Sequence, residues 1–117
     1  MSDRGAGEEP VNVGVARRDI SPPLGVDLCG FIAREGPTTG IHDPLYSTAL
    51  VASDGGNILA LTVCDLIGLG AKAVARLRAA VQRRTGIPAA TQMYACTHTH
   101  GGPDTGVITT TGAADPA

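Results

Sequence analysis

Aromatic residues are nearly absent from this sequence, and its few cysteines form no recognisable pairing. Only Phe31, Tyr46 and Tyr94 are aromatic, although hydrophobic residues make up 43% of the 117-residue chain. Any core must therefore be built from aliphatic side chains and alanine, and it will be thin. The three cysteines, an odd number without a CxxC pair, are interpreted as reduced thiols buried in that core.

Long hydrophobic runs and an excess of positive charge are lacking as well. No apolar segment approaches the roughly 20 residues that span a bilayer. The start MSDRGAGEEP lacks the basic-then-apolar order of a signal peptide. These absences predict no transmembrane segment and a cytoplasmic location for the chain as written. With a net charge of -2 and scattered basic residues, no nucleic-acid partner is predicted.

The chain divides by composition into three parts. Residues 1–10 are polar and contain glycine, which predicts a disordered lead-in. Residues 11–106 carry the strand and helix patterns of one domain. Residues 107–117 form a tail without a core-forming pattern. Within the domain, the irregular stretch 26–44 is predicted to be a long surface connection.

Two kinds of strand signal open the domain. Val11, Val13 and Val15 alternate with small or polar residues, which predicts a half-buried strand over 11–20. Two apolar runs then flank the turn Asp-Gly-Gly, which predicts a β-hairpin because Gly55 and Gly56 can both adopt a positive φ.

A helix and a further strand follow the hairpin. Val74, Leu77 and Val81 recur at helical spacing, and Gly86 supplies a stop. The stretch TQMYACTHTH then restores a strand pattern. Strand, helix and strand in this order form a βαβ unit, whose strands lie parallel. The predicted fold class is therefore α/β, a mixed sheet with a β-hairpin followed by a βαβ unit.

Candidate functional residues stand where the two parallel strands end. Ligand sites in such sheets lie beyond the carboxyl ends of the strands. Asp65 ends the first strand, and His98 and His100 end the second. Because residues i and i+2 of an extended chain point to one side, the two imidazoles are expected to face a common cavity. Neutral imidazoles suit zinc, and a catalytic zinc lowers the pKa of its water to about 7.

The residues alone leave several interpretations of this end of the sheet open. The HisXHis pair is metal-binding or incidental with similar weight, and Cys96 either joins it or is a buried thiol. His42 lies in the long connection and has no spacing that demands a role. Asp104 caps the glycine-rich turn behind the pair or orients a histidine, with the cap favoured. The glycines of that turn permit backbone N–H groups to approach an anion.

Four segments in order resemble the amino-terminal part of the neutral/alkaline, non-lysosomal ceramidase family. They are VGVARRDISPPLGVDLCGF, GIHDPLYSTALV, TVCDLIGLG and CTHTHGGPDTG, and together they run from about residue 13 to 106. The resemblance implies a zinc-dependent amidase that hydrolyses the N-acyl bond of ceramide to give sphingosine and a fatty acid. It implies that His98 is a zinc ligand and that His100 lies near metal and substrate. Family members are often secreted or membrane-associated.

The resemblance also implies that the active site is incomplete here. In that family the remaining ligands are a histidine, a glutamate and a tyrosine from much later in a longer chain. The sequence after His100 contains none of these residue types. We therefore expect an amino-terminal fragment of a ceramidase-like enzyme, with His98 as metal ligand, and His100 and Asp65 as catalytic residues. Its expected partners are a lipid amide such as ceramide and the missing carboxy-terminal part.

Two alternatives come from other classes. A HisXHis pair at a strand end also opens the site of barrel amidohydrolases, although three strands and a helix precede it here. The second alternative is a non-catalytic small domain or remnant, in which the histidines bind nothing.

Overall fold

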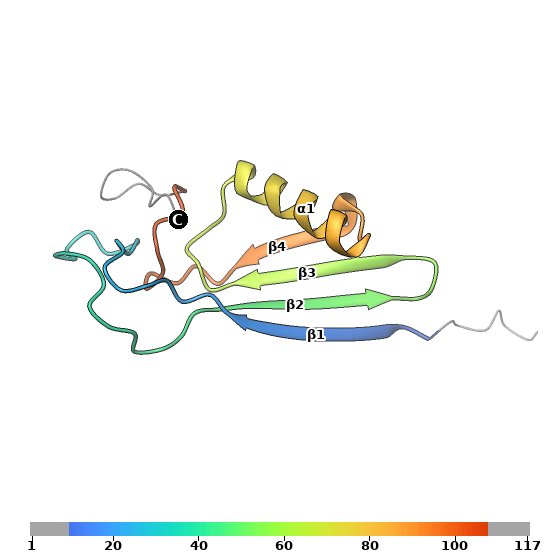
Figure 1. The fold of residues 1–117 in the computed structure, drawn as a ribbon, viewed down its shortest axis with the longest axis horizontal. Coiled ribbons are helices and arrows are strands. Elements are labelled where there is room, and N and C mark those ends of the chain that lie inside the picture. Colours follow the sequence, from blue (N-terminus) through green and yellow to red (C-terminus); the bar gives the residue numbers. More distant parts are fainter. Residues whose placement is uncertain (1–9, 108–117) are drawn as a thin grey trace, which may run out of the picture.

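The structure, a computed structural model, describes residues 10–107 and places them in a four-stranded sheet with one long helix (Figure 1). The strands lie in chain order, the first three pair antiparallel, and the fourth is parallel to the third. This confirms the predicted α/β class, with a hairpin followed by a βαβ unit. The elements are β1 (Asn12–Asp19), β2 (Tyr46–Ser53), β3 (Ile58–Cys64), α1 (Ala71–Thr85), the short 3-10 helix η1 (Ala89–Thr91) and β4 (Gln92–Cys96).

Asp54 holds the turn between β2 and β3. One carboxylate oxygen accepts hydrogen bonds from the backbone N–H groups of Gly56, at 3.0 Å, and Asn57, at 2.6 Å. Gly55 has a φ of 88°, as the sequence predicted, whereas Gly56 lies outside the left-handed region. The carboxylate of Asp54 therefore stabilises the turn at the point where the prediction relied on a second glycine.

The helix α1 ends where the sequence predicts. Gly86 has a φ of 78°, and its N–H donates to the carbonyl of Gln82. After this turn the chain returns through η1 to β4, which pairs with β3 so that Cys96 lies beside Cys64. Both strands therefore end at the same rim of the sheet.

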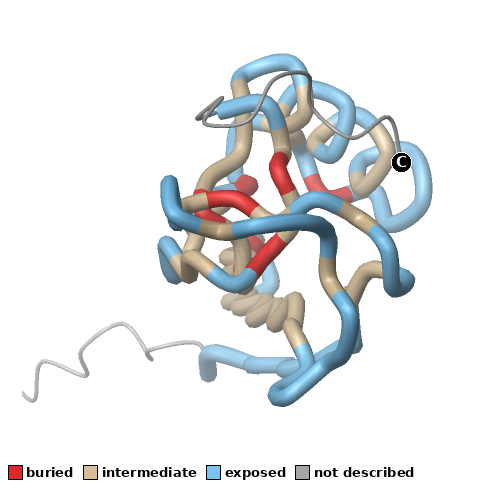
Figure 2. Tube along the Cα trace, turned by 90° about the vertical axis from the view of Figure 1, so that its left-hand side faces the viewer, coloured by how far each residue is buried: buried red, intermediate tan, exposed pale blue. Residues whose placement is uncertain are grey.

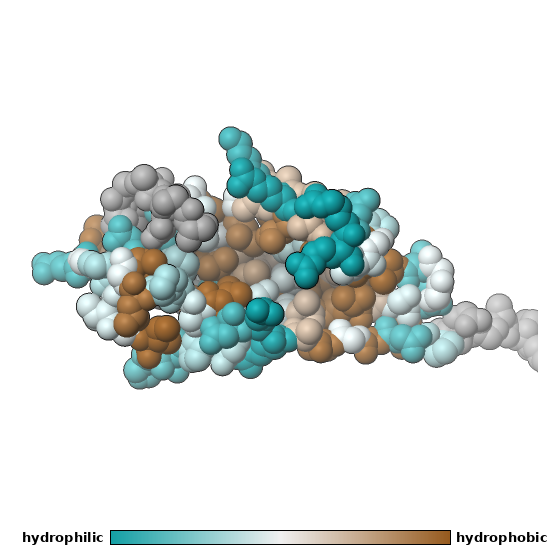
Figure 3. All heavy atoms as spheres, viewed as in Figure 1, coloured by the Kyte–Doolittle hydropathy of each residue, from teal (hydrophilic) through white to brown (hydrophobic). Residues whose placement is uncertain are grey.

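The helix covers only part of one face of the sheet. On that side Ala60 and Cys64 of β3 and Gln92 of β4 are buried. Hydrophilic residues gather over α1, and hydrophobic residues remain visible over the strands below it (Figure 3). The buried residues form a small cluster among exposed segments (Figure 2). The core is as thin as the composition predicts.

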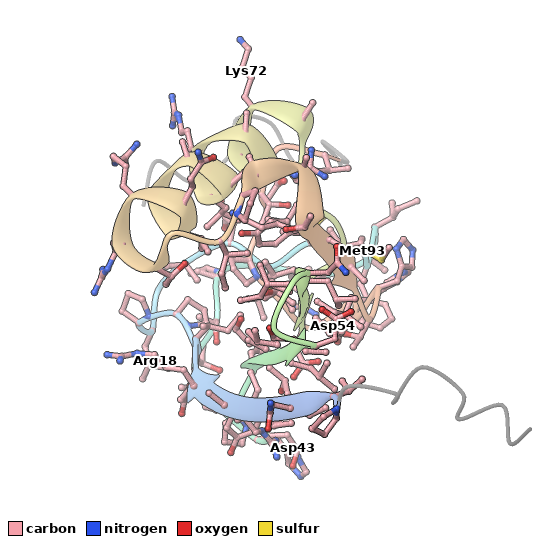
Figure 4. The ribbon with its side chains drawn as sticks, turned by 90° about the vertical axis from the view of Figure 1, so that its right-hand side faces the viewer. Arg18, Asp43, Asp54, Lys72 and Met93 are labelled. Carbon is pink, nitrogen blue, oxygen red and sulfur yellow. The ribbon has the colours of Figure 1, made fainter. Side chains whose placement is uncertain are left out.

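The opposite face of the sheet is uncovered in the described part of the chain. The register places Val15, Leu50, Leu61 and Met93 in one row across the four strands. Met93 points away from α1 (Figure 4). Val15 is 68% exposed and Met93 64%. The prediction of a half-buried first strand is therefore wrong: all eight residues of β1 are exposed, because no described segment packs on their apolar side.

The long connection between β1 and β2 is mostly exposed, but part of it returns to the rim. The Cys29 N–H donates to the carbonyl of Gly102 at 2.9 Å, and Leu28 forms an antiparallel bridge with Pro103. Cys29 is fully buried. The prediction of a surface connection is therefore wrong at this point, since these residues pack behind the end of β4.

The predicted lead-in, 1–10, and tail, 107–117, lie outside the described residues apart from Pro10 and Val107, and they stay predictions. Between those two residues, no helix combines the length and the apolar character that crossing a bilayer requires.

Candidate active site

The rim at the carboxyl ends of β3 and β4 carries the residues that the sequence indicated. Asp65 directly follows β3, and His98 is the second residue after β4. The N–H of Thr97 donates to the carbonyl of Cys64, and that of His98 to the carbonyl of Leu66, both at 3.0 Å. Backbone hydrogen bonding therefore continues beyond the strands and orders this rim.

His98 and His100 lie side by side, but not for the predicted reason. The prediction assumed an extended chain, whereas β4 ends at Cys96 and His98 has a left-handed φ of 61°. The turn brings the two ring centroids to 5.1 Å, with 66° between the ring planes. Left-handed backbone at a residue other than glycine costs about 1–3 kcal/mol, and such strain gathers at functional sites.

The ring of His98 is oriented by the backbone that leaves β3. Its Nδ1 lies 2.8 Å from the carbonyl oxygen of Ile67, a residue only 4% exposed. Because a carbonyl only accepts, Nδ1 carries the proton in this hydrogen bond, and in the neutral imidazole Nε2 then has the free lone pair. A metal-binding histidine typically donates its other ring N–H to such a carbonyl. His98 therefore fits zinc as a ligand through Nε2.

His100 lies against the connection between β1 and β2. Its ring meets Phe31 edge-on, with centroids 5.6 Å apart. The Arg34 guanidinium donates to the backbone carbonyl of His100 at 3.3 Å. A Cβ on Gly30 would lie 2.6 Å from the His100 side chain. Sequence reasoning missed this packing, because Gly30 and Phe31 stand in a stretch without periodicity, where the glycine is the only signal.

The Asp65 carboxylate links the ends of neighbouring strands. One carboxylate oxygen accepts from the Thr97 hydroxyl at 3.1 Å, and the other from the backbone N–H of Tyr46 at 2.9 Å. The hollow that Asp65 lines, of about 480 Å³, is shared with Thr97 and Thr99 and is lined by neither imidazole of the pair. The Asp65 carboxylate therefore holds the residue before His98 in place but lines a hollow separate from the two imidazoles.

The turn behind the histidines is closely packed. The Gly101 N–H donates to the Thr99 hydroxyl at 3.2 Å, and a Cβ on Gly102 would lie 3.4 Å from the backbone oxygen of Asp65. Asp104, 3% exposed, accepts from the N–H of Gly106 at 2.7 Å, which is the predicted turn cap. These glycines let two backbone segments approach each other, and their predicted role toward an anion stays a prediction.

His42 borders the same hollow as Asp65, on its outer side. Its Nδ1 lies 2.8 Å from the Asp43 carboxylate, and both side chains are almost fully exposed, at 98% and 87%. This hydrogen bond, together with the charge of Asp43, raises the pKa of His42. His42 therefore approaches the rim but lies in solvent beside a carboxylate of its own.

The donor set on this rim is partial. Within residues 10–107, no three His, Cys, Asp or Glu side chains are grouped so that they would hold a metal ion. Cys96 is half-buried on the helix side of β4, and burial, with Cys64 nearby, raises the pKa of its thiol. Because zinc binds the thiolate, this environment disfavours Cys96 as a third ligand.

The fold and rim define a class: an α/β sheet region that carries two neighbouring imidazoles beyond the ends of parallel strands. The chain is similar to solved ceramidase structures. With the neutral ceramidase from Pseudomonas aeruginosa it shares 26% identity at a TM-score of 0.72, covering 83% of this chain and 16% of that one. A ceramidase complexed with C2 matches at 26% identity and a TM-score of 0.71, over 80% and 15%.

The chain therefore contains a neutral ceramidase-like region, which is a partial domain of that larger fold. It spans 16% of the length of the first ceramidase chain that it matches. Among family models and curated proteins, none matches the chain. The predicted resemblance to neutral ceramidases is thus supported by structure, whereas its amino-terminal placement stays a prediction.

Proposed function

We propose that this chain contributes to the active site of a zinc-dependent amide hydrolase of the neutral ceramidase type, which converts N-acylsphingosine to sphingosine and a fatty acid. The observation that carries the proposal is the hydrogen bond between His98 Nδ1 and the Ile67 carbonyl, because it leaves Nε2 of an exposed ring ready for a metal. The structural likeness to ceramidases supports the choice of lipid amide as substrate.

Each residue on the rim has a part in this proposal. Zinc, when bound, supplies an electrophile that acidifies water and polarises the amide carbonyl. His98 holds the metal, and the Ile67 carbonyl keeps its ring in one tautomer. His100, whose ring lies 5.1 Å from that of His98, positions substrate or water. Asp65 acts as a positioning residue by holding Thr97, the residue before His98.

A longer ceramidase-like polypeptide is the proposed partner, since two imidazoles leave a catalytic zinc short of the three protein ligands that it normally has. We expect the 117-residue chain to be inactive by itself toward a fluorescent ceramide, even with added zinc. Turnover by the metal-free purified chain after zinc addition would contradict this expectation.

Zinc titration by calorimetry tests the metal site directly. His98→Ala is expected to weaken zinc binding by at least about tenfold, because even the loss of a residue that only orients a ligand typically costs 10–100-fold. His42→Ala is the matched control, since His42 is 98% exposed and interacts with Asp43. Equal affinities in the parent and His98→Ala would reject the site and favour a non-catalytic remnant.

A further inference from the structure

A glycine about 70 positions earlier in the chain lies directly against His100 of the candidate site. Gly30 has a φ of 107°, and a Cβ built there would lie 2.6 Å from both Cβ and Cγ of His100. Real Cβ atoms essentially never come so near to another atom. The His100 side chain can therefore occupy this position only because residue 30 has no side chain.

Phe31 contacts the ring of His100, and Arg34 contacts its backbone. Phe31 presents its ring edge-on to that of His100, with 76° between the planes. Arg34 donates to the His100 carbonyl, and its guanidinium carbon lies 5.4 Å from the centroid of the Phe31 ring. A hydrogen bond from the Cys29 N–H to the Gly102 carbonyl anchors this segment behind the rim. The ring of His100 is thus bounded by Gly30, Phe31 and His98.

We propose that Gly30 and Phe31 are positioning residues that set the plane and place of the His100 ring beside His98. Gly30 provides the space, and the Phe31 ring fixes the rotation of the imidazole within it. The catalytic relevance of this inference rests on the proposed function. The position of the His100 ring, in contrast, can be measured in the chain without metal. The connection between β1 and β2 is thereby part of the active site.

The chain offers a matched control for the glycine. Gly36 lies in the same connection with a φ of 81°, and a Cβ there would meet no atom within 4 Å. Gly30→Ala and Gly36→Ala both place alanine at a positive φ, but only the first drives a methyl group into His100. Backbone strain contributes to both variants, so a change in the His100 ring signals that occurs only in Gly30→Ala reports the contact with His100.

The experiment is NMR of the histidine ring protons in the metal-free chain. The parent and Gly36→Ala are expected to show cross-peaks between the rings of His98 and His100. In Gly30→Ala these cross-peaks are expected to be lost, with a shift of the His100 ring signals. Phe31→Leu is expected to remove the ring-current shift of His100, and Phe31→Tyr to retain it. Phe31 is 55% exposed, so these two variants keep the test valid if Gly30→Ala fails to fold.

A zinc arm separates this inference from the proposed function. If the cross-peaks between the two rings are lost in Gly30→Ala but not in Gly36→Ala, while zinc shifts no histidine signal, the positioning role of Gly30 is supported and the proposed zinc site is rejected. If zinc shifts the His98 signals but Gly30→Ala and Phe31→Leu leave the His100 ring unchanged, the positioning role is overturned and the metal function stands.

Discussion

Asp65 and Thr97 are joined by a hydrogen bond of 3.1 Å across the carboxyl ends of β3 and β4. The second carboxylate oxygen of Asp65 accepts from the Tyr46 N–H at the start of β2. One side chain thus connects three strands at the rim that carries His98. The ends of these strands, together with the connection that holds Gly30 and Phe31, surround the imidazole pair.

Asp65→Asn is expected to lower the free energy of unfolding. Asparagine can still accept from the Tyr46 N–H and donate its NH₂ group to the Thr97 hydroxyl, but neither hydrogen bond is charge-assisted any longer, so we expect a loss of about 1 kcal/mol. Urea unfolding measures this. Thr97→Val removes one hydrogen bond only and is expected to cost about 0.5–1.5 kcal/mol. Because both changes affect the same contact, their effects should not add. Strictly additive losses would contradict the bond.

A second prediction concerns Gln92, a buried polar residue with 3% exposure. Its side-chain amide donates to the carbonyls of Arg78 and Ile87 and accepts from the Tyr94 hydroxyl. Gln92→Met keeps the volume but leaves these groups unpaired, so we expect a loss of about 2–3 kcal/mol in urea unfolding.

The control for Gln92 is the same substitution at an exposed glutamine. The side-chain oxygen of Gln82 accepts a hydrogen bond from the Ala89 N–H at 3.1 Å, and Gln82 lies at the surface. Gln82→Met is expected to cost less than about 1 kcal/mol. Equal losses for the two variants would show that Gln92 does not link α1 to β4.

A pH dependence follows from the hairpin turn. The side chain of Asn57, and then the N–H groups of Asn57 and Gly56, hold the pKa of Asp54 below its ordinary value of 3.8. A carboxyl group with a lowered pKa stabilises the fold above 3.8 and loses that effect as the pH falls through its lowered value. Thermal unfolding between about pH 5 and pH 2 should therefore show a falling midpoint.

Asp54→Asn is expected to flatten part of that fall, because the amide does not titrate. Asp19, whose pKa is lowered by its hydrogen bonds to Ser21, remains in both proteins and leaves a residual slope. Identical acid profiles of the parent and Asp54→Asn would contradict a role for the turn carboxylate.

The uncovered face of the sheet predicts self-association of the isolated chain. Val15 lies at 68% exposure in the apolar row shared with Leu50, Leu61 and Met93. Large apolar patches of this kind mark interfaces or cause aggregation. Val15→Lys is expected to shift the chain toward monomer in sedimentation velocity. Asn12→Lys adds the same charge to the other face of β1, and an equal effect would show that net charge alone is responsible.

Local patterns predict the fold where the causes are local. The turn at Gly55 and the stop at Gly86 follow from neighbouring residues. The parallel pairing of β3 and β4 follows from the order strand, helix, strand. The burial of β1 does not, because alternation shows which side is apolar but not whether another segment covers it. The predicted cytoplasmic location stays a prediction.

The sequence predicts which residues lie in the candidate site but not how they are arranged. The rim brings His98 and His100 together as expected, yet the strand period fails after Cys96, where the chain turns at a φ of 61°. The part that fixes His100 comes from Gly30 and Phe31, and contacts between residues about 70 positions apart depend on tertiary packing. Asp65 lies at the rim, but on its threonine side.

The sheet order β1-β2-β3-β4 has a consequence for how the site assembles. Since each strand pairs with the one made before it, a chain leaving the ribosome can build the sheet in sequence without waiting for later segments. His98 and His100 emerge after β4, when Asp65 and the connection between β1 and β2 have already been made. The imidazole pair is therefore placed only after the sheet, together with the turn at Gly102 and Pro103 that pairs with Cys29 and Leu28.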